Sequence, residues 1–104
     1  MTEIIEAIAQ EIDDRAETLE GVRQTAGESS TTYSRADRVF AVARDDGFEF
    51  HVGEVIAGAA LRTPDTTISQ RGSEWVRFSP AELDEPALDR ALAWFEAAWR
   101  RAEG

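Results

Sequence analysis

The chain has 104 residues, with 21 acidic against 11 basic side chains, a formal net charge of −10 and no cysteine. The missing cysteine excludes disulfides and thiolate metal sites and favours an intracellular address. The negative charge disfavours binding to nucleic acid or anionic lipid. No apolar run is long enough to span a bilayer, and the acidic start Met-Thr-Glu-Ile-Ile-Glu is unlike a secretory signal. We therefore expect a cytoplasmic protein.

The kind of charged residue is as unusual as the net charge. Lysine and asparagine are absent, and every basic side chain apart from His51 is an arginine. A lysine-free acidic surface is typical of halophilic proteins, because a charged, hydrated surface resists precipitation in molar salt. High genomic GC content also replaces lysine by arginine, and an acidic docking surface is the functional alternative. We favour the two environmental explanations over a docking surface.

The first half of the chain predicts one helix followed by three strands. Apolar residues at helical spacing predict a helix between Thr2 and Gly21, with the stripe Ile5, Ile8, Ile12, Ala16 and Leu19. The polar, aperiodic residues 23–30 predict a loop. Residues 30–35, 38–44 and 48–52 then predict strands, with turns at Ala36-Asp37 and Asp45-Asp46-Gly47.

The second half predicts a helix, two strands and a closing helix. Gly53 and Pro64 bound a short helix whose apolar face is Val55, Ile56, Ala59 and Ala60. Residues 66–69 and 74–78 predict strands joined at Arg71-Gly72, where we interpret both residues as turn chemistry. The last helix carries the stripe Leu88, Leu92, Phe95, Trp99 and Ala102. On this pattern Trp99 belongs to the core, and Trp94 is part-exposed beside it, at a packing edge or a dimer contact.

These elements predict one α+β domain over residues 1–104. The order helix–three strands–helix–two strands–helix favours a single antiparallel sheet with helices on one face. Alternation then buries Phe48, Phe50, Val52, Val76 and Phe78 beneath the helices.

The same alternation predicts which side chains lie on the other, open face of the sheet. Glu49, His51, Trp75 and Arg77 point away from the core, and Tyr33 joins them if its strand has the matching register. Trp and Arg are enriched at the centres of interfaces, so these five residues are the predicted ligand- or partner-binding site. The structural alternative is that Trp75 covers the sheet and Arg77 pairs with Glu49 across strands.

No motif predicts catalysis, a metal or a cofactor. His51 is the only histidine, and no nucleophile motif accompanies it. One histidine without cysteine does not fit a zinc site, and the turn at residues 45–47 lacks the alternating ligands of a calcium loop. We expect no catalytic residues, no metal and no cofactor.

The runs RVFAVARDDGFEFHV and GSEWVRF, followed by an amphipathic last helix, resemble the small MmcQ/YjbR-like and TfoX N-terminal domains of secretion-chaperone-like architecture. For some members the resemblance implies DNA binding, which the net charge disfavours here. Type III secretion chaperones share this layout, which implies small acidic homodimers that bind an extended partner segment. No residue matches a family site, so the resemblance transfers none.

Two classes of function fit these observations. The first is a non-catalytic protein-binding or self-assembly module, homodimeric through the open sheet face or the last helix. The second is a small-molecule binder or enzyme with its site on the open face at His51, Trp75 and Arg77. Neither involves nucleic acid or a membrane as a partner.

Overall fold

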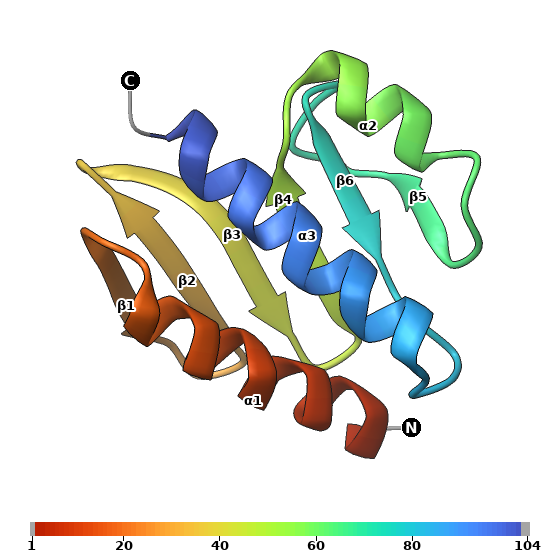
Figure 1. The fold of residues 1–104 in the computed structure, drawn as a ribbon, viewed down its shortest axis with the longest axis horizontal. Helices are drawn as coiled ribbons and strands as arrows, with labels where there is room; N and C mark the ends of the chain where they lie inside the picture. The colour runs from red at the N-terminus through yellow and green to blue at the C-terminus, as the bar shows by residue number, and fades with distance from the viewer. Residues whose placement is uncertain (1, 103–104) are drawn as a thin grey trace.

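The computed structural model describes residues 2–102, which form three helices and six strands (Figure 1). In chain order these are α1 (Thr2–Thr18), β1 (Val22–Ala26), β2 (Ser30–Arg35), β3 (Arg38–Arg44), β4 (Gly47–His51), α2 (Glu54–Ala60), β5 (Thr66–Ile68), β6 (Trp75–Phe78) and α3 (Glu85–Arg101).

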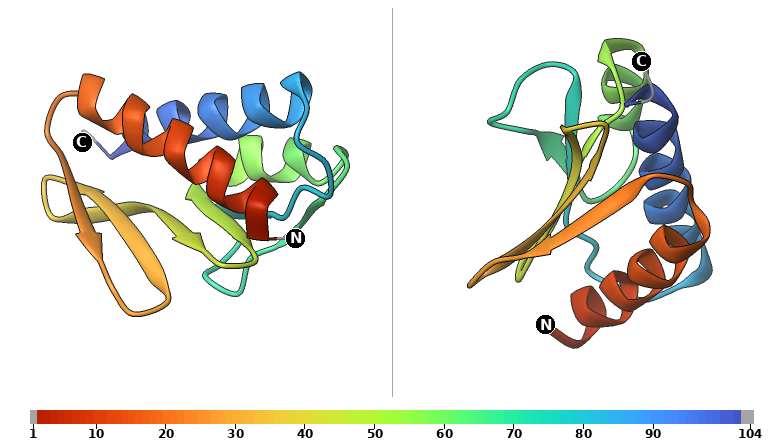
Figure 2. Two further views of the ribbon diagram at one scale, coloured as in Figure 1. Left: turned by 90° about the horizontal axis from the view of Figure 1, so that it is seen from below. Right: turned by 90° about the vertical axis from the view of Figure 1, so that its left-hand side faces the viewer.

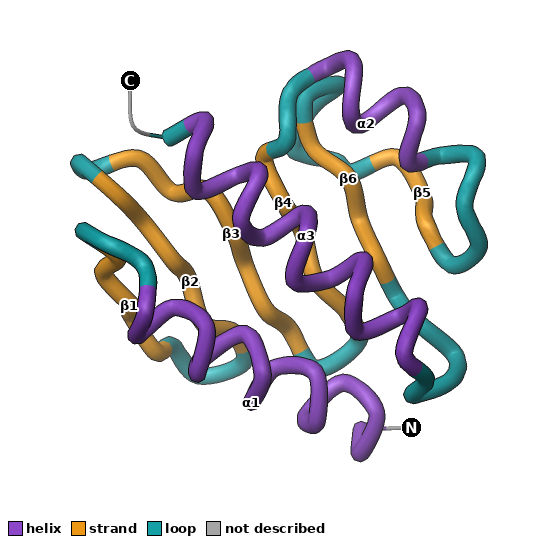
Figure 3. The backbone as a smooth tube through the Cα atoms, in the orientation of Figure 1, coloured by secondary structure: helices purple, strands orange, loops and turns teal. Residues whose placement is uncertain are grey.

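The strands form one antiparallel sheet in the order β1-β2-β3-β4-β6-β5. In Figure 3, α1 and α3 cross in front of the sheet, and α2 lies beside the end formed by β6 and β5. Figure 2 shows all three helices on the same side of the sheet. The predicted α+β class, with helices packed against an antiparallel sheet, is confirmed. Within the described range, no helix is both long and apolar enough to cross a membrane.

The core lies between the sheet and the two long helices. All four phenylalanine and valine side chains predicted to face the helices from β4 and β6 are buried: Phe48, Phe50, Val76 and Phe78. From α3, the ring of Phe95 meets Tyr33 edge-on at a centroid distance of 5.1 Å and Phe40 at 5.3 Å. The predicted stripe of α1 is buried at Ile5, Ile8, Ile12 and Ala16.

Strand β1 replaces most of the loop predicted at residues 23–30, so that prediction is wrong. Residues Val22–Ala26 pair with Thr31–Arg35 of β2 in continuous antiparallel register. The polar run has no apolar face to reveal it as a strand, and pairing with β2 satisfies its backbone instead. The connecting turn shrinks to residues 27–29 and is closed by the Gly27 amide, which donates to the Ser30 carbonyl at 2.7 Å.

The next two turns are those that the sequence predicts. Ala36 and Asp37 join β2 to β3 with φ of 52° and 67°. Positive φ at both central residues is typical of the two-residue hairpin turn that matches strand twist. Gly47 follows Asp45-Asp46 and pairs with Arg44 at the start of the β3–β4 ladder.

Helix α2 presents a different face to the sheet from the one predicted. Ala57 and Ala60 are buried, whereas Val55 is 87% exposed and Ile56 and Ala59 are also exposed. With only alanines inward, α2 lies against β6 through a narrow contact, and its bulky side chains point to solvent. The sequence predicted the helix correctly but not the face that it turns to the sheet, because packing against β6 decides how α2 is rotated about its own axis.

On α3 the buried line runs through Ala87, Ala91, Phe95 and Ala98. Phe95 of the predicted stripe belongs to this line, whereas Leu88, Leu92 and Trp99 flank it, so Trp99 is half-buried rather than core. Its Nε1 donates to the Glu20 carbonyl at 2.8 Å, and the Arg35 guanidinium covers its ring at 4.1 Å. Trp94 lies edge-on to Phe78 at a centroid distance of 5.2 Å, so it is a packing edge as one alternative expected.

Replacing Phe95 by alanine should lower the free energy of unfolding by about 3–5 kcal/mol, because it opens a cavity where α3 meets the sheet. Urea unfolding monitored by tryptophan fluorescence measures the change. The control Leu83→Ala removes an exposed apolar side chain and should change stability by less than about 0.5 kcal/mol. Equal losses in both variants would contradict the described core.

Candidate functional site

The open face of the sheet is organised around the carboxylate of Glu49. This side chain points away from the helices, yet the residue is only 5% exposed. Its Oε2 accepts from the Ser69 hydroxyl at 2.6 Å, and its Oε1 accepts from Nε of Arg44 and of Arg71, each at 3.2 Å. The segment between β5 and β6 therefore folds onto the open face and closes over Glu49.

Opposing effects act on the ionisation of Glu49. Burial by itself raises the pKa of this carboxyl, but the hydrogen bonds from Ser69, Arg71 and Arg44 together lower the pKa below its usual value. Glu49 is consequently ionised at neutral pH. A buried carboxylate with donors on both oxygens stabilises the position of every group that contacts it.

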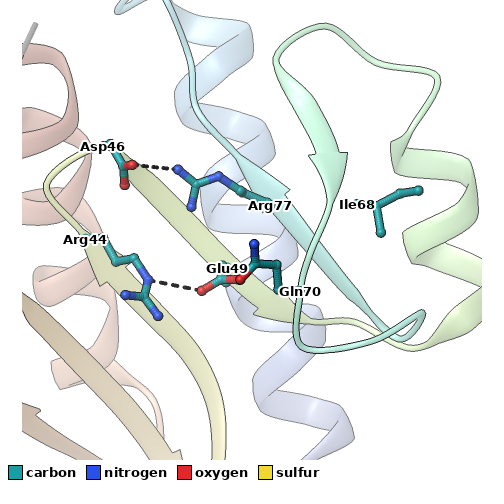
Figure 4. Close-up of a pocket in the computed structure, with 6 residues that line it drawn as sticks. All are labelled: Arg44, Asp46, Glu49, Ile68, Gln70 and Arg77. Carbon is teal, nitrogen blue, oxygen red and sulfur yellow. Dashed lines mark hydrogen bonds and ion pairs between the residues drawn. The ribbon is translucent and has the colours of Figure 1, made fainter.

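Arg77 does not make the contact predicted for it. It lies directly opposite Glu49 in the β4–β6 register, but its Nη2 pairs with Asp46 Oδ2 at 2.9 Å. The predicted Arg77–Glu49 pair is wrong, because Ser69, Arg71 and Arg44 already occupy the Glu49 carboxylate. Figure 4 shows the two separate ion pairs, Arg77 with Asp46 and Arg44 with Glu49.

A shallow groove of about 350 Å³ runs along this part of the open face. Arg44, Asp46, Glu49, Ile68, Gln70 and Arg77 line it (Figure 4). The charges of the two arginines and the two carboxylates cancel. Each guanidinium has five N–H donors, and its ion pair with one of these carboxylates does not use all of them. The groove could therefore accept a small polar group.

His51 and Trp75 form a second cluster, apart from this groove. Their rings stack at a centroid distance of 4.9 Å and an angle of 10°, and the Arg71 guanidinium lies 5.2 Å from the Trp75 ring centre. His51 Nε2 is hydrogen-bonded to Glu74 Oε1 at 2.7 Å, and Arg101 donates to the same oxygen at 3.1 Å. The hydrogen bond with His51, followed by that from Arg101, lowers the pKa of Glu74.

The predicted site is therefore divided. Glu49 and Arg77 line the 350 Å³ groove, while His51 lines a different one of about 290 Å³ with Arg38, Val39, Arg101 and Ala102. Trp75 is half-buried between its neighbours and covers this part of the sheet. This arrangement matches the structural alternative for Trp75.

The placement of Tyr33 on the open face is wrong. Tyr33 is buried on the helix side, and its hydroxyl donates to Asp13 Oδ1 of α1 at 2.5 Å. Burial, followed by the contact with Asp13, strongly raises the pKa of Tyr33. A register shift in β2 after Tyr33 separates the two halves of this strand, and alternation along the sequence could not locate it.

Sequence reasoning missed Arg44, Ser69 and Arg71 as partners of Glu49. Arg71 was interpreted as turn chemistry, and it does lie in a turn in which the Gly72 amide donates to the Ser69 carbonyl at 3.4 Å, but its side chain also binds Glu49. One signal was available: a glutamate between two phenylalanines at the centre of a strand needs hydrogen-bonding partners if it is buried. The sequence offers eleven arginines as candidates and does not rank them.

Within residues 2–102, no three metal-ligating side chains converge on one point. No family model matches this chain, and neither the search of curated proteins nor that of solved structures returned a significant match. The resemblance to MmcQ/YjbR-like and TfoX N-terminal domains thus rests on the sequence runs alone.

Replacing Glu49 by glutamine should lower the free energy of unfolding by about 2 kcal/mol at neutral pH, because charge-assisted hydrogen bonds from two arginines are lost. The matched control Asp46→Asn weakens an exposed ion pair and should cost at most about 1 kcal/mol. Urea unfolding at several pH values measures both.

The pKa of Glu49 is lower in the folded than in the unfolded chain, so its contribution is complete above the unfolded pKa and is lost as the pH falls through the folded pKa. The gap between wild type and Glu49→Gln should therefore narrow below about pH 4. A gap that widens on acidification would contradict this account of the cluster.

Proposed function

We propose that this chain is a non-catalytic module that binds a protein partner. One observation carries the proposal: four of the six exposed large apolar side chains in the described range lie within residues 55–68. They are Val55, Ile56 and Leu61 of α2 and its C-terminal cap, and Ile68 of β5, and we call these four exposed side chains the α2–β5 surface.

The exposure of this surface is unusual for the chain. Val55 is 87% and Ile68 73% exposed, whereas the apolar residues of the long helices α1 and α3 are mostly buried or half-buried. Exposed aliphatic side chains that gather in one region typically mark a protein contact. The net charge of −10 favours a partner with apolar anchors surrounded by basic residues.

A small-molecule site on the open face remains the alternative. The groove between Arg44 and Arg77 favours it, because guanidinium donors there could bind an anionic or amide group. The division of His51 and Arg77 between two grooves weighs against the version of this site that uses both residues.

We also propose that the acid excess adapts the chain to molar salt. Among the described residues, the contacts between basic and acidic side chains include those of four carboxylates, Asp46, Glu49, Glu74 and Glu96, whereas the chain has 11 basic residues for 21 acidic side chains. The mutual repulsion of the acidic side chains should destabilise the fold in dilute buffer and be screened in concentrated salt. The thermal midpoint should rise when KCl is raised from about 0.05 M to 2 M. A flat or falling midpoint in a calorimetric scan would contradict this adaptation.

The double variant Val55→Ser with Ile68→Ser tests the α2–β5 surface. Both side chains are exposed, so unfolding stability should change by less than about 1 kcal/mol. Immobilised wild type should retain a protein from an extract of the source organism, and the double variant should not. The matched control Leu83→Ser alters an exposed leucine outside this surface and should retain the same protein. Equal retention by all three chains, or by none, would contradict the proposal.

A further inference from the structure

Strand β1 forms the edge of the sheet farthest from the α2–β5 surface, and no element within residues 2–102 covers its outer side. Among the described strands it pairs with β2 alone, and four of its five residues are exposed. The right-hand view of Figure 2 faces this edge, and β1 runs across it with no other element in front. The outward backbone amides and carbonyls of β1 are therefore available to another strand.

This edge lacks most of the features that prevent strands from pairing between molecules. Natural edges are blunted by proline, lysine, bulges or very short strands. β1 contains neither proline nor lysine, pairs over all five residues without a register shift, and has Arg23 as its single charge. The opposite edge strand, β5, has only three residues.

We propose that β1 pairs antiparallel with β1 of a second copy of this chain, about a twofold axis at Gln24. This inference goes beyond the proposed function, because it concerns the other edge of the sheet. The dimer would have one continuous sheet of twelve strands, twice the six of one copy. An α2–β5 surface would remain free at each end.

Strand geometry selects this register. In an antiparallel pair, directly opposite residues have the same hydrogen-bonding role, and this role alternates along the strand. A symmetric pair of identical strands must therefore be centred on a residue. Only a centre at Gln24 pairs all five residues of β1, and it places Val22 opposite Ala26 and Arg23 opposite Thr25 of the second copy.

Charge is consistent with this centre. A pair centred on Arg23 would place two arginines directly opposite each other, which destabilises a sheet. At the Gln24 centre no two charged residues of β1 are opposite. Gln24 Nε2 donates to Asp13 Oδ1 of α1 at 2.9 Å, so Asp13 of each copy would lie near the axis. Concentrated salt screens their repulsion and should favour the dimer.

The oligomeric state of the full chain in about 2 M KCl is the first measurement. A strand edge buries less area than a standard interface, so a concentration of about 100 µM is appropriate for light scattering after size exclusion. We expect twice the monomer mass. The double variant at Val55 and Ile68 should have the same mass as wild type, so a failure of this inference is distinguishable from a failure of the proposed function.

Single cysteines then test the register, because the natural chain has none. Opposite residues in an antiparallel pair have Cβ atoms about 5 Å apart, and diagonal ones lie about 7–8 Å apart. Under mild oxidation, Gln24→Cys should form a covalent dimer with itself. Arg23→Cys and Thr25→Cys should crosslink mainly when the two variants are mixed, giving a heterodimer by mass spectrometry.

Circular dichroism of each variant should match wild type, since these positions are at an exposed edge. A monomer at every salt concentration would overturn the proposal. A dimer in which Gln24→Cys fails to crosslink, or in which the mixed variants give no excess of heterodimer, would also overturn it, because the contact would then lie elsewhere.

Discussion

The buried carboxylate of Glu49 is the constraint on which the open face depends. It lies at the centre of β4 and joins β3 through Arg44 and the β5–β6 connection through Ser69 and Arg71. Without these donors a charge at this depth would be strongly unfavourable. The connection is therefore held against the sheet, and Arg71 is placed over Trp75. A face that helices leave uncovered is in this way partly covered by the chain's own loop.

The few cations of this acidic chain connect elements that are distant in sequence. Arg15 of α1 pairs with Glu96 of α3, Arg77 of β6 with Asp46 in the β3–β4 turn, and Arg101 of α3 with Glu74 before β6. Each pair is partly exposed, so each contributes little alone. Together they place positive charge at the joints between elements. The surplus of carboxylates is left on the outer surface, where salt and water can screen it.

The helices cover the sheet unequally, and the two edges differ as a result. α3 lies over the central strands β3 and β4, and α1 lies along the β1–β2 side, where its Asp13 contacts Gln24 and Tyr33, whereas α2 is short and contacts β6 through alanines (Figure 1). The β5 end thus carries exposed aliphatic side chains, and the β1 end carries an open backbone edge. Exposed aliphatic side chains and an open strand edge thus lie at opposite ends of one six-stranded sheet.

The sequence by itself determined the α+β class, three helices, five of the six strands and the core phenylalanines, because these depend on local periodicity. It could not determine β1, whose strand state depends on pairing with β2, or the rotation of α2. The face of the sheet on which Tyr33 lies depends on a register shift in β2. Ser69 and Arg71, two of the partners of Glu49, are twenty or more residues away from it in the sequence. Only the tertiary structure decided these features, since each depends on which segments contact one another, and no local sequence pattern specifies these contacts.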